Sequence, residues 1–236
     1  MAAEQKQSPI PGSAKELARH LQRLKDLRGA GAKRPARLAE LKRFQAKRLA
    51  RSYADLAAQP RDRAATAFFL DDLYGPKDFS ARDQEMLRIV PVMSRILPGS
   101  ALETAALAIE LEAVSEGLDQ RLAAALREGP IDDEAYAAAY RESSTREERH
   151  HQIDLIEAVG KRLDALVRKP LVSHMLKLMR APAHMAGLGG LQAFLEEGFA
   201  SFRDMKGADE FLATLRSREE KILSRLFSGV AEPFSP

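Results

Sequence analysis

Residues 145–168 read TREERHHQIDLIEAVGKRLDALVR, and this stretch decides the fold class of the chain. Projected at about 100° per residue, its apolar side chains fall on one arc of a helix. That arc holds Ile153, Leu155, Ile156, Val159, Leu163, Leu166 and Val167. Thr145 followed three residues later by Glu148 is a capping box, which marks the start of a helix. We therefore predict an amphipathic helix that buries one face.

The same helical pattern recurs along most of the chain, and no segment alternates with the period of a strand. Helices are predicted over residues 13–28, 35–58, 60–74, 80–97, 100–128, a short segment from 132 or 133, 145–168, 170–180, 182–205 and 208–227. The connections between them are short, which favours antiparallel neighbours. The fold class expected is all-α, a multi-helix bundle of about nine helices with mostly antiparallel neighbours.

Proline, glycine and charge divide the chain into four parts. Residues 1–12 are predicted to be a disordered tail, and residues 13–34 a basic N-terminal helix with its linker. Residues 35–229 are predicted to form a single helical domain, followed by a C-terminal tail over 230–236. A chain of 236 residues is long enough to bury one substantial core.

Composition excludes several kinds of protein. With 0 cysteines there is no disulfide framework, no thiolate metal site and no cysteine nucleophile. No run approaches the roughly 18 apolar residues that a membrane span needs. The first residues contain no apolar segment typical of a secretory signal. We therefore expect a cytoplasmic protein with no membrane span.

Net charge is distributed unevenly along the chain. Residues 1–63 carry 16 Lys and Arg against 6 Asp and Glu, whereas residues 64–236 carry 21 against 28. A basic arm can bind nucleic acid or an anionic surface, bind an acidic partner, or lie on its own acidic body. We expect the arm to pack partly on the body, leaving weak, salt-sensitive binding to polyanions. The packing stripe expected comprises Leu38, Leu41, Phe44, Leu49, Tyr53 and Leu56.

Some polar side chains fall on the inward, apolar faces of these helices. They are Arg48, Asp72, Arg82, Arg149, Gln152 and Glu219. A buried charge without a partner is costly, so inward charges are expected to meet one another. Asp72 in particular is expected to be buried and paired with Arg149 or Arg82. Such a network either fixes the register of the helices or lines a ligand pocket.

Two overlapping Glu-x-x-His pairs occur in one helix, Glu147 with His150 and Glu148 with His151. This spacing is found in di-iron carboxylate bundles, where the ligands point into the core. Here the pairs project outward and no second matching pair exists in the sequence. We therefore expect no metal and no other cofactor. A site made of Glu147, His150, His151 and Asp154 is the weaker alternative.

One segment carries a resemblance to a known family. Residues 68–83, FFLDDLYGPKDFSARD, together with residues 149–153, 179–183 and 191–199, resemble an uncharacterised bacterial all-helical family with an FFLxDLYGPxDF motif. The resemblance covers most of residues 36–228. It implies a single intact domain of unknown function, and it implies no activity.

Three functions remain open. The first is a non-catalytic binding protein for a partner protein or a small anionic ligand. The second is a helical enzyme using an inward cluster of Asp72, Arg149 and Glu219, possibly assisted by a metal. The third is a binder of nucleic acid or other polyanions through residues 13–51.

Overall fold

The structure is a computed structural model of the chain, and it describes residues 12–29, 34–70 and 99–234. These residues form helices and no strand, so the prediction of an all-α fold is confirmed. The helices are α1 (Gly12–Arg28), α2 (Leu38–Ser52), α3 (Ala54–Ala58), α4 (Arg63–Phe68), α6 (Gly99–Ala125), α7 (Asp133–Ser143), α8 (Arg146–Val167), α9 (Pro170–Met185), α10 (Gly189–Met205) and α11 (Asp209–Ser228).

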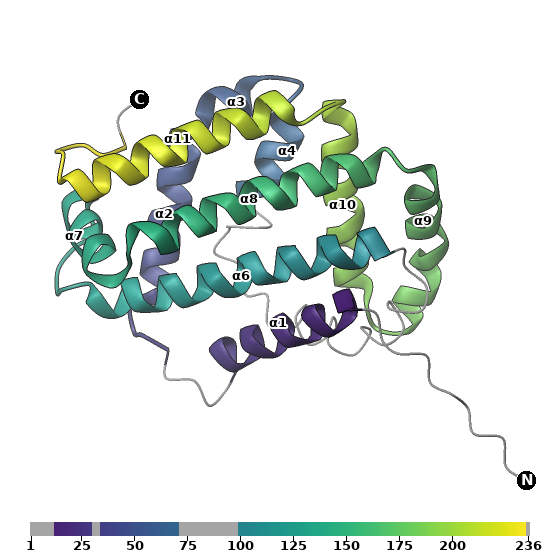
Figure 1. Cartoon of the computed structure of the whole chain (residues 1–236), viewed down its shortest axis with the longest axis horizontal. Helices are drawn as coiled ribbons and strands as arrows, with labels where there is room; N and C mark the ends of the chain where they lie inside the picture. Colours follow the sequence, from purple (N-terminus) through teal and green to yellow (C-terminus); the bar gives the residue numbers. More distant parts are fainter. Residues whose placement is uncertain (1–11, 30–33, 71–98, 235–236) are drawn as a thin grey trace, which may run out of the picture.

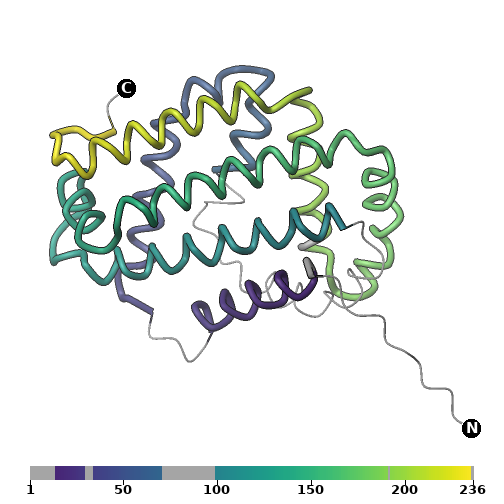
Figure 2. The backbone as a smooth tube through the Cα atoms, in the orientation of Figure 1, coloured from purple at the N-terminus to yellow at the C-terminus, as the bar shows by residue number. Residues whose placement is uncertain are grey.

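Two layers of helices enclose the core. Four helices lie side by side in the order α1, α6, α8, α11 (Figure 1). Behind them α2 and α10 cross the layer, with α7 at one end and α9 at the other (Figure 2). Residues from both layers form the apolar clusters, so the core lies between them.

Ion pairs between neighbouring helices show whether the helices run parallel or antiparallel. Arg162 of α8 contacts Glu103 of α6, whereas Arg121 further along α6 contacts Glu148 near the start of α8. These two helices are therefore antiparallel, although α7 lies between them in the sequence. In contrast, α1 runs parallel to α6, because Arg28 at the end of α1 contacts Glu116 rather than the start of α6.

The helix predicted over residues 145–168 forms as α8. The Thr145 side chain accepts a hydrogen bond from the Glu148 backbone, and the Glu148 side chain accepts one from the Thr145 backbone. The capping box is thus confirmed, and it satisfies backbone donors that would otherwise lack partners at the helix start. The apolar arc of α8 faces the core through Ile153, Leu155 and Val159.

The predicted boundary at Pro182 is wrong. Pro182 lies inside α9, and the Ala186 backbone N–H still donates to the Pro182 carbonyl at 3.0 Å. A proline removes its own backbone donor, but α9 continues past Pro182 for three more residues, to Met185. The helix ends instead at Met185, and two residues later Gly187 has a φ of +72°, a left-handed conformation that glycine adopts readily.

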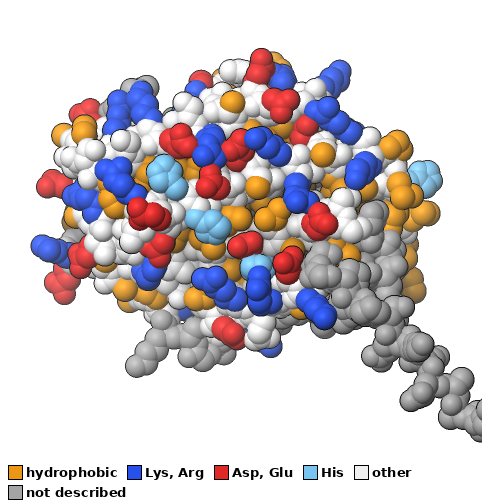
Figure 3. Space-filling model, viewed as in Figure 1, with side chains coloured by type: hydrophobic (Ala, Val, Ile, Leu, Met, Phe, Trp, Pro, Cys, Tyr) orange, Lys and Arg blue, Asp and Glu red, His pale blue; other side chains and the backbone are white. Residues whose placement is uncertain are grey.

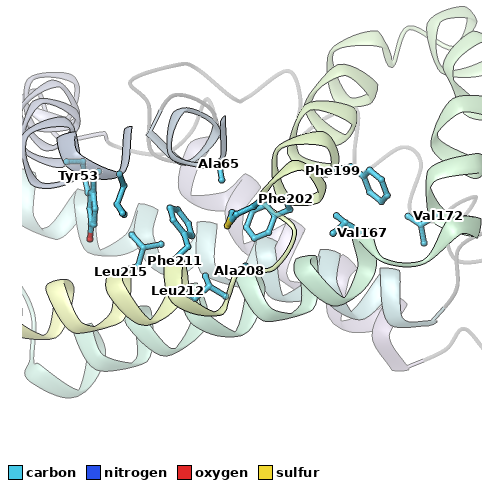
Figure 4. Packing of buried hydrophobic residues seen from close by; sticks show 13 residues of the cluster. Tyr53, Ala65, Val167, Val172, Phe199, Phe202, Ala208, Phe211, Leu212 and Leu215 are labelled. Atoms are coloured by element: carbon cyan, nitrogen blue, oxygen red, sulfur yellow. The ribbon is translucent and has the colours of Figure 1, made fainter. Parts of the chain in front are cut away.

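The predicted helix over residues 35–58 is interrupted at Tyr53. This residue has φ −121° and ψ 18°, and it separates α2 from α3. Tyr53 is 1% exposed and belongs to the largest apolar cluster, between α10, α11 and the α3–α4 segment (Figure 4). Its ring points toward α11, where Leu215 lies beside it (Figure 4).

The basic arm packs on the rest of the chain. The stripe expected to be buried contributes Leu38 and Leu41 to one apolar cluster and Leu49, Tyr53 and Leu56 to another, so this prediction is confirmed. Phe44 stacks on Tyr136 of α7 at 5.1 Å between ring centroids.

Charges of the arm meet carboxylates of the body. Ion pairs join Lys42 to Glu116 and Arg51 to Asp133, at 2.8 Å and 3.3 Å. Figure 3 shows acidic and basic side chains interspersed over the face formed by α1, α6, α8 and α11. The arm therefore neutralises part of its own charge on the body. Within the described ranges, no helix has the length and apolar character needed to cross a membrane.

Acid is expected to weaken the packing of α1 through His20, which is 8% exposed and lies 3.8 Å from Glu110. Burial lowers the pKa of His20 below 6.5. The charges of Glu110 and Glu16 oppose this shift, whereas those of Arg19 and Arg23 reinforce it. Below pH 6.5 the unfolded chain therefore takes up a proton that the folded chain resists. The contribution of His20 to the free energy of unfolding should be constant above pH 6.5 and should fall below it.

Chemical denaturation of the wild type and His20→Gln at a series of pH values measures this effect. We expect the wild type to lose more stability than the variant between about pH 6.5 and 5. Parallel curves for the two proteins would show that His20 does not couple the packing of α1 to pH.

Candidate functional site

A cavity of about 190 Å³ lies in the core between the two layers. One part of its described wall is apolar and comes from α6, α8, α10 and α11. That part consists of Ile109, Ile153, Ile156, Phe194, Leu195, Leu212 and Leu215. The other part is polar and comes mainly from α2, α6, α7 and α8. It includes Gln45, Arg48, Ser115, Asp119, Tyr136, Tyr140, Arg149, Gln152 and Glu219.

The central helix α6 supplies a polar stripe to this cavity. Glu112, Ser115, Glu116 and Asp119 follow the spacing i, i+3, i+4 and i+7, which places them on one face of a helix. All four line the cavity. The remaining faces of α6 pack against α1, α7 and α8 through apolar residues.

Arg149 enters the polar part of the wall from the first turns of α8. It is 3% exposed, and its Nε donates to Ser144 Oγ at 3.0 Å. Its Nη1 donates to Gln152 Oε1 at 3.1 Å. Gln152 in turn donates from Nε2 to Ser115 Oγ at 2.8 Å, which ties α8 to α6. These neutral groups hold the guanidinium in a fixed orientation.

The charge of Arg149 is not matched by an ion pair. None of the carboxylates in the described part of the chain pairs with it, and its Nη2 is buried without a hydrogen-bond acceptor there. The Tyr140 ring lies 4.0 Å from the guanidinium carbon, a cation–π contact that compensates part of the charge. Burial in turn raises the pKa of the Tyr140 hydroxyl. Arg149 is therefore a buried cation held by neutral groups.

Asp119 lies at the same level on the facing helix. The Ser115–Gln152 hydrogen bond fixes the register of the antiparallel pair α6 and α8. Asp119 lies one turn after Ser115 in α6, and Arg149 lies one turn before Gln152 in α8. Because the helices are antiparallel, both turns lie in the same direction from the hydrogen bond. Both residues line the cavity.

The carboxyl group of Asp119 has one hydrogen-bond partner among the described residues, Gln45 Nε2 at 2.8 Å. Burial raises the pKa of Asp119 above 3.8, opposed by the Gln45 hydrogen bond and by the charges of Lys42 and Arg149. Although it is surrounded by protein, Asp119 keeps accessible surface, because it faces the cavity.

Arg48 and Glu219 form a separate ion pair on the cavity wall. Arg48 Nη1 donates to Glu219 Oε1 at 2.8 Å, and the same oxygen accepts from the Tyr53 hydroxyl at 2.6 Å. Burial works against the charged form of Arg48, but Glu219 outweighs it and raises the pKa of Arg48. Burial and then Glu219 raise the pKa of Tyr53. Tyr53 is thus a neutral donor that joins α2 to α11.

A third group surrounds Glu116, whose side chain is 2% exposed. Glu116 Oε2 accepts from Arg28 Nε at 3.0 Å and from Lys42 Nζ at 2.8 Å, and Oε1 accepts from Gln120 at 3.1 Å. Burial would raise the pKa of Glu116, but Lys42 and Arg28 outweigh it, so the net pKa is lowered. This ionised carboxylate joins α1, α2 and α6.

Comparison with known proteins places the chain in a family. It matches the profile described as a domain of unknown function (DUF8198) over residues 25–233. The chain belongs to this family. No curated protein and no solved structure matches the chain. The whole described wall of the cavity falls inside the DUF8198 domain, but the description of the family assigns no activity to it.

The described members of the polar set singled out in the sequence fall into two separate hydrogen-bonded groups of the DUF8198 domain. Arg48 pairs with Glu219, as inward charges are expected to do, whereas Arg149 is held with Gln152 by neutral groups. Asp72 and Arg82 lie outside the described residues, as does most of the FFLxDLYGPxDF motif. The sequence analysis did not single out Asp119 and Glu116, which lie on the polar stripe of α6.

The Glu-x-x-His pairs lie on the outer face of α8. His150 and His151 are exposed, and His151 Nε2 lies 3.9 Å from a Glu110 oxygen. Asp154 of the same face pairs with Arg216 of α11 at 2.8 Å. Across the described residues, no group of three or more His, Asp or Glu is placed to hold a metal ion.

Proposed function

We propose that this chain is a non-catalytic binding protein whose core cavity takes up a small anionic ligand with an apolar portion. The observation that carries the proposal is the environment of Arg149. Its guanidinium lines the cavity, and no carboxylate of the described residues pairs with it. Leaving a buried cation unpaired costs several kcal/mol. An anion bound beside it would recover part of that energy.

Size and wall chemistry support a ligand of the same kind. An apolar cavity of about 150 Å³ holds a molecule as large as benzene. The cavity here, at about 190 Å³, has room for a somewhat larger molecule. One part of its wall is aliphatic and aromatic and the other is polar, which is typical of sites for small organic ligands. A short branched carboxylate fits both parts.

The enzyme interpretation receives less support. It requires Arg149 and Glu219 to act in one cluster with Asp72, which lies outside the described residues. Glu219 is occupied by Arg48 and Tyr53, while Arg149 belongs to a different hydrogen-bond group. The polyanion interpretation is weakened as well, because Lys42, Arg48 and Arg51 are already paired with carboxylates of the body.

Titration calorimetry with 4-methylpentanoate and with the neutral 4-methyl-1-pentanol tests the proposal. We expect saturable binding of the carboxylate and at least about tenfold weaker binding of the alcohol, because only the carboxylate forms charge-assisted hydrogen bonds with Arg149. The ligand should also raise the melting temperature, by an amount that increases with its concentration.

Two variants of α8 make the test specific. Arg149→Met should abolish the preference for the carboxylate over the alcohol. Arg162→Met removes an exposed arginine that pairs with Glu103, and it should bind both probes as the wild type does. If neither probe binds the wild type, or if Arg149→Met keeps the preference, the proposed function is wrong.

A further inference from the structure

We infer that the cavity is built for an amino acid with an apolar side chain, with Arg149 taking the carboxylate and Asp119 taking the amino group. This inference rests on the proposed function, and it goes further by assigning a second recognition residue. It is carried by the placement, on the two sides of one cavity, of a cation and a carboxyl group that have no ion pair among the described residues.

The register of two helices brings these groups to one level. Ser115 and Gln152 are joined at 2.8 Å across α6 and α8. Because the helices are antiparallel, moving one turn from this hydrogen bond toward the C-terminal end of α6 reaches Asp119 on α6 and Arg149 on α8. The two groups do not form an ion pair with each other. A ligand with a positive and a negative group close together can contact both.

Among the described residues, the other cations that line the cavity with Asp119 and Arg149 include Lys42 and Arg48, and both are occupied. Lys42 is bonded to Glu116 at 2.8 Å, and Arg48 is bonded to Glu219 at 2.8 Å. Gln45 supplies a neutral hydrogen bond to Asp119 and no charge. A carboxylate buried without a cation is disfavoured. A primary ammonium group, with three donors, supplies both the charge and the hydrogen bonds that Asp119 lacks.

The apolar wall then receives the side chain of the ligand. Ile109, Ile156, Leu212 and Leu215 come from three helices that meet on the side of the cavity formed by α6, α8 and α11. These four side chains are aliphatic, so the surface that they form suits an aliphatic side chain of a ligand. Leucine combines a carboxylate, an ammonium group and such a side chain in a molecule of suitable size.

Binding of an amino acid should depend on pH through Asp119. The charged groups nearest to it are Lys42, Arg149 and Glu116. Burial raises the pKa of Asp119, and an ammonium ligand lowers it again by favouring the carboxylate. Ligand binding therefore releases a proton wherever free Asp119 is protonated, so affinity should fall as the pH is lowered into that range.

The test compares L-leucine, 4-methylpentanoate and 3-methylbutan-1-amine by titration calorimetry. These probes share a branched alkyl group, and the last two lack the amino group and the carboxylate respectively. We expect L-leucine to bind at least about tenfold more tightly than either single-charge probe. In Asp119→Asn the ratio of leucine affinity to 4-methylpentanoate affinity should fall to about one.

The outcomes separate this inference from the proposed function. If 4-methylpentanoate binds through Arg149 but leucine binds no more tightly, the assignment of Asp119 is wrong and the proposed function stands. If no probe binds, both are wrong. Glu103→Gln, an exposed change on α6, serves as the matched control and should keep the leucine preference. A preference that survives in Asp119→Asn would also contradict the inference.

Discussion

Replacing Glu116 by alanine is expected to lower the free energy of unfolding by about 3–5 kcal/mol. The side chain is 2% exposed and accepts hydrogen bonds from Arg28 and Lys42. Its removal leaves Lys42 without this carboxylate and, among the described residues, Arg28 with Glu112 as its carboxylate partner, and it cuts the polar link between α1, α2 and α6. Denaturant unfolding of the variant and the wild type at neutral pH measures the difference.

Acid should reproduce part of this loss. The folded pKa of Glu116 is lowered below 4.5, so its contribution is present above that value and is lost as pH falls through the folded pKa. Glu103→Ala provides the control on the same helix, since its pair with Arg162 is exposed and such pairs contribute about 0–1 kcal/mol. Equal losses in Glu116→Ala and Glu103→Ala would contradict the structural role given to Glu116.

Replacing Glu219 by alanine should cost a similar amount, about 3–5 kcal/mol. The change leaves the buried Arg48 guanidinium without its carboxylate and the Tyr53 hydroxyl without its acceptor. Arg48 is poorly placed to compensate, because its Nε is already buried without an acceptor among the described residues.

A double variant distinguishes a stranded charge from a lost packing contact. Arg48→Met with Glu219→Leu removes both charges and keeps apolar volume, so it should be less destabilised than Glu219→Ala alone. Denaturant unfolding of the two variants provides the comparison. A double variant that is less stable than the single one would show that the ion pair itself, rather than the stranded cation, determines the cost.

The fold could be predicted from the sequence because its signals are local. The capping box at Thr145 and Glu148 involves residues three positions apart, and the apolar arc of α8 repeats within two turns. Pro182 misled the prediction, because α9 contains this proline in its last turn and continues to Met185. The parallel packing of α1 on α6 has no local signal, since the two segments are distant in sequence.

The site could be predicted only in part, because contacts between residues distant in the sequence leave no local signal. Helical projection found Arg48, Arg149 and Glu219, because each interrupts an apolar arc of its own helix. It could not choose their partners, since Arg48 and Glu219 are 171 positions apart. Asp119 was missed because α6 is apolar around most of its circumference, so no single arc stands out against which to judge a polar residue.

A crystal structure of the chain grown with saturating 4-methylpentanoate tests the central claim most directly. We predict density for the ligand in the core cavity, with its carboxylate within hydrogen-bonding distance of Arg149 and its alkyl group against Ile156 and Leu212. A cavity that contains only ordered water, or a ligand bound elsewhere with Arg149 unchanged, would contradict the account.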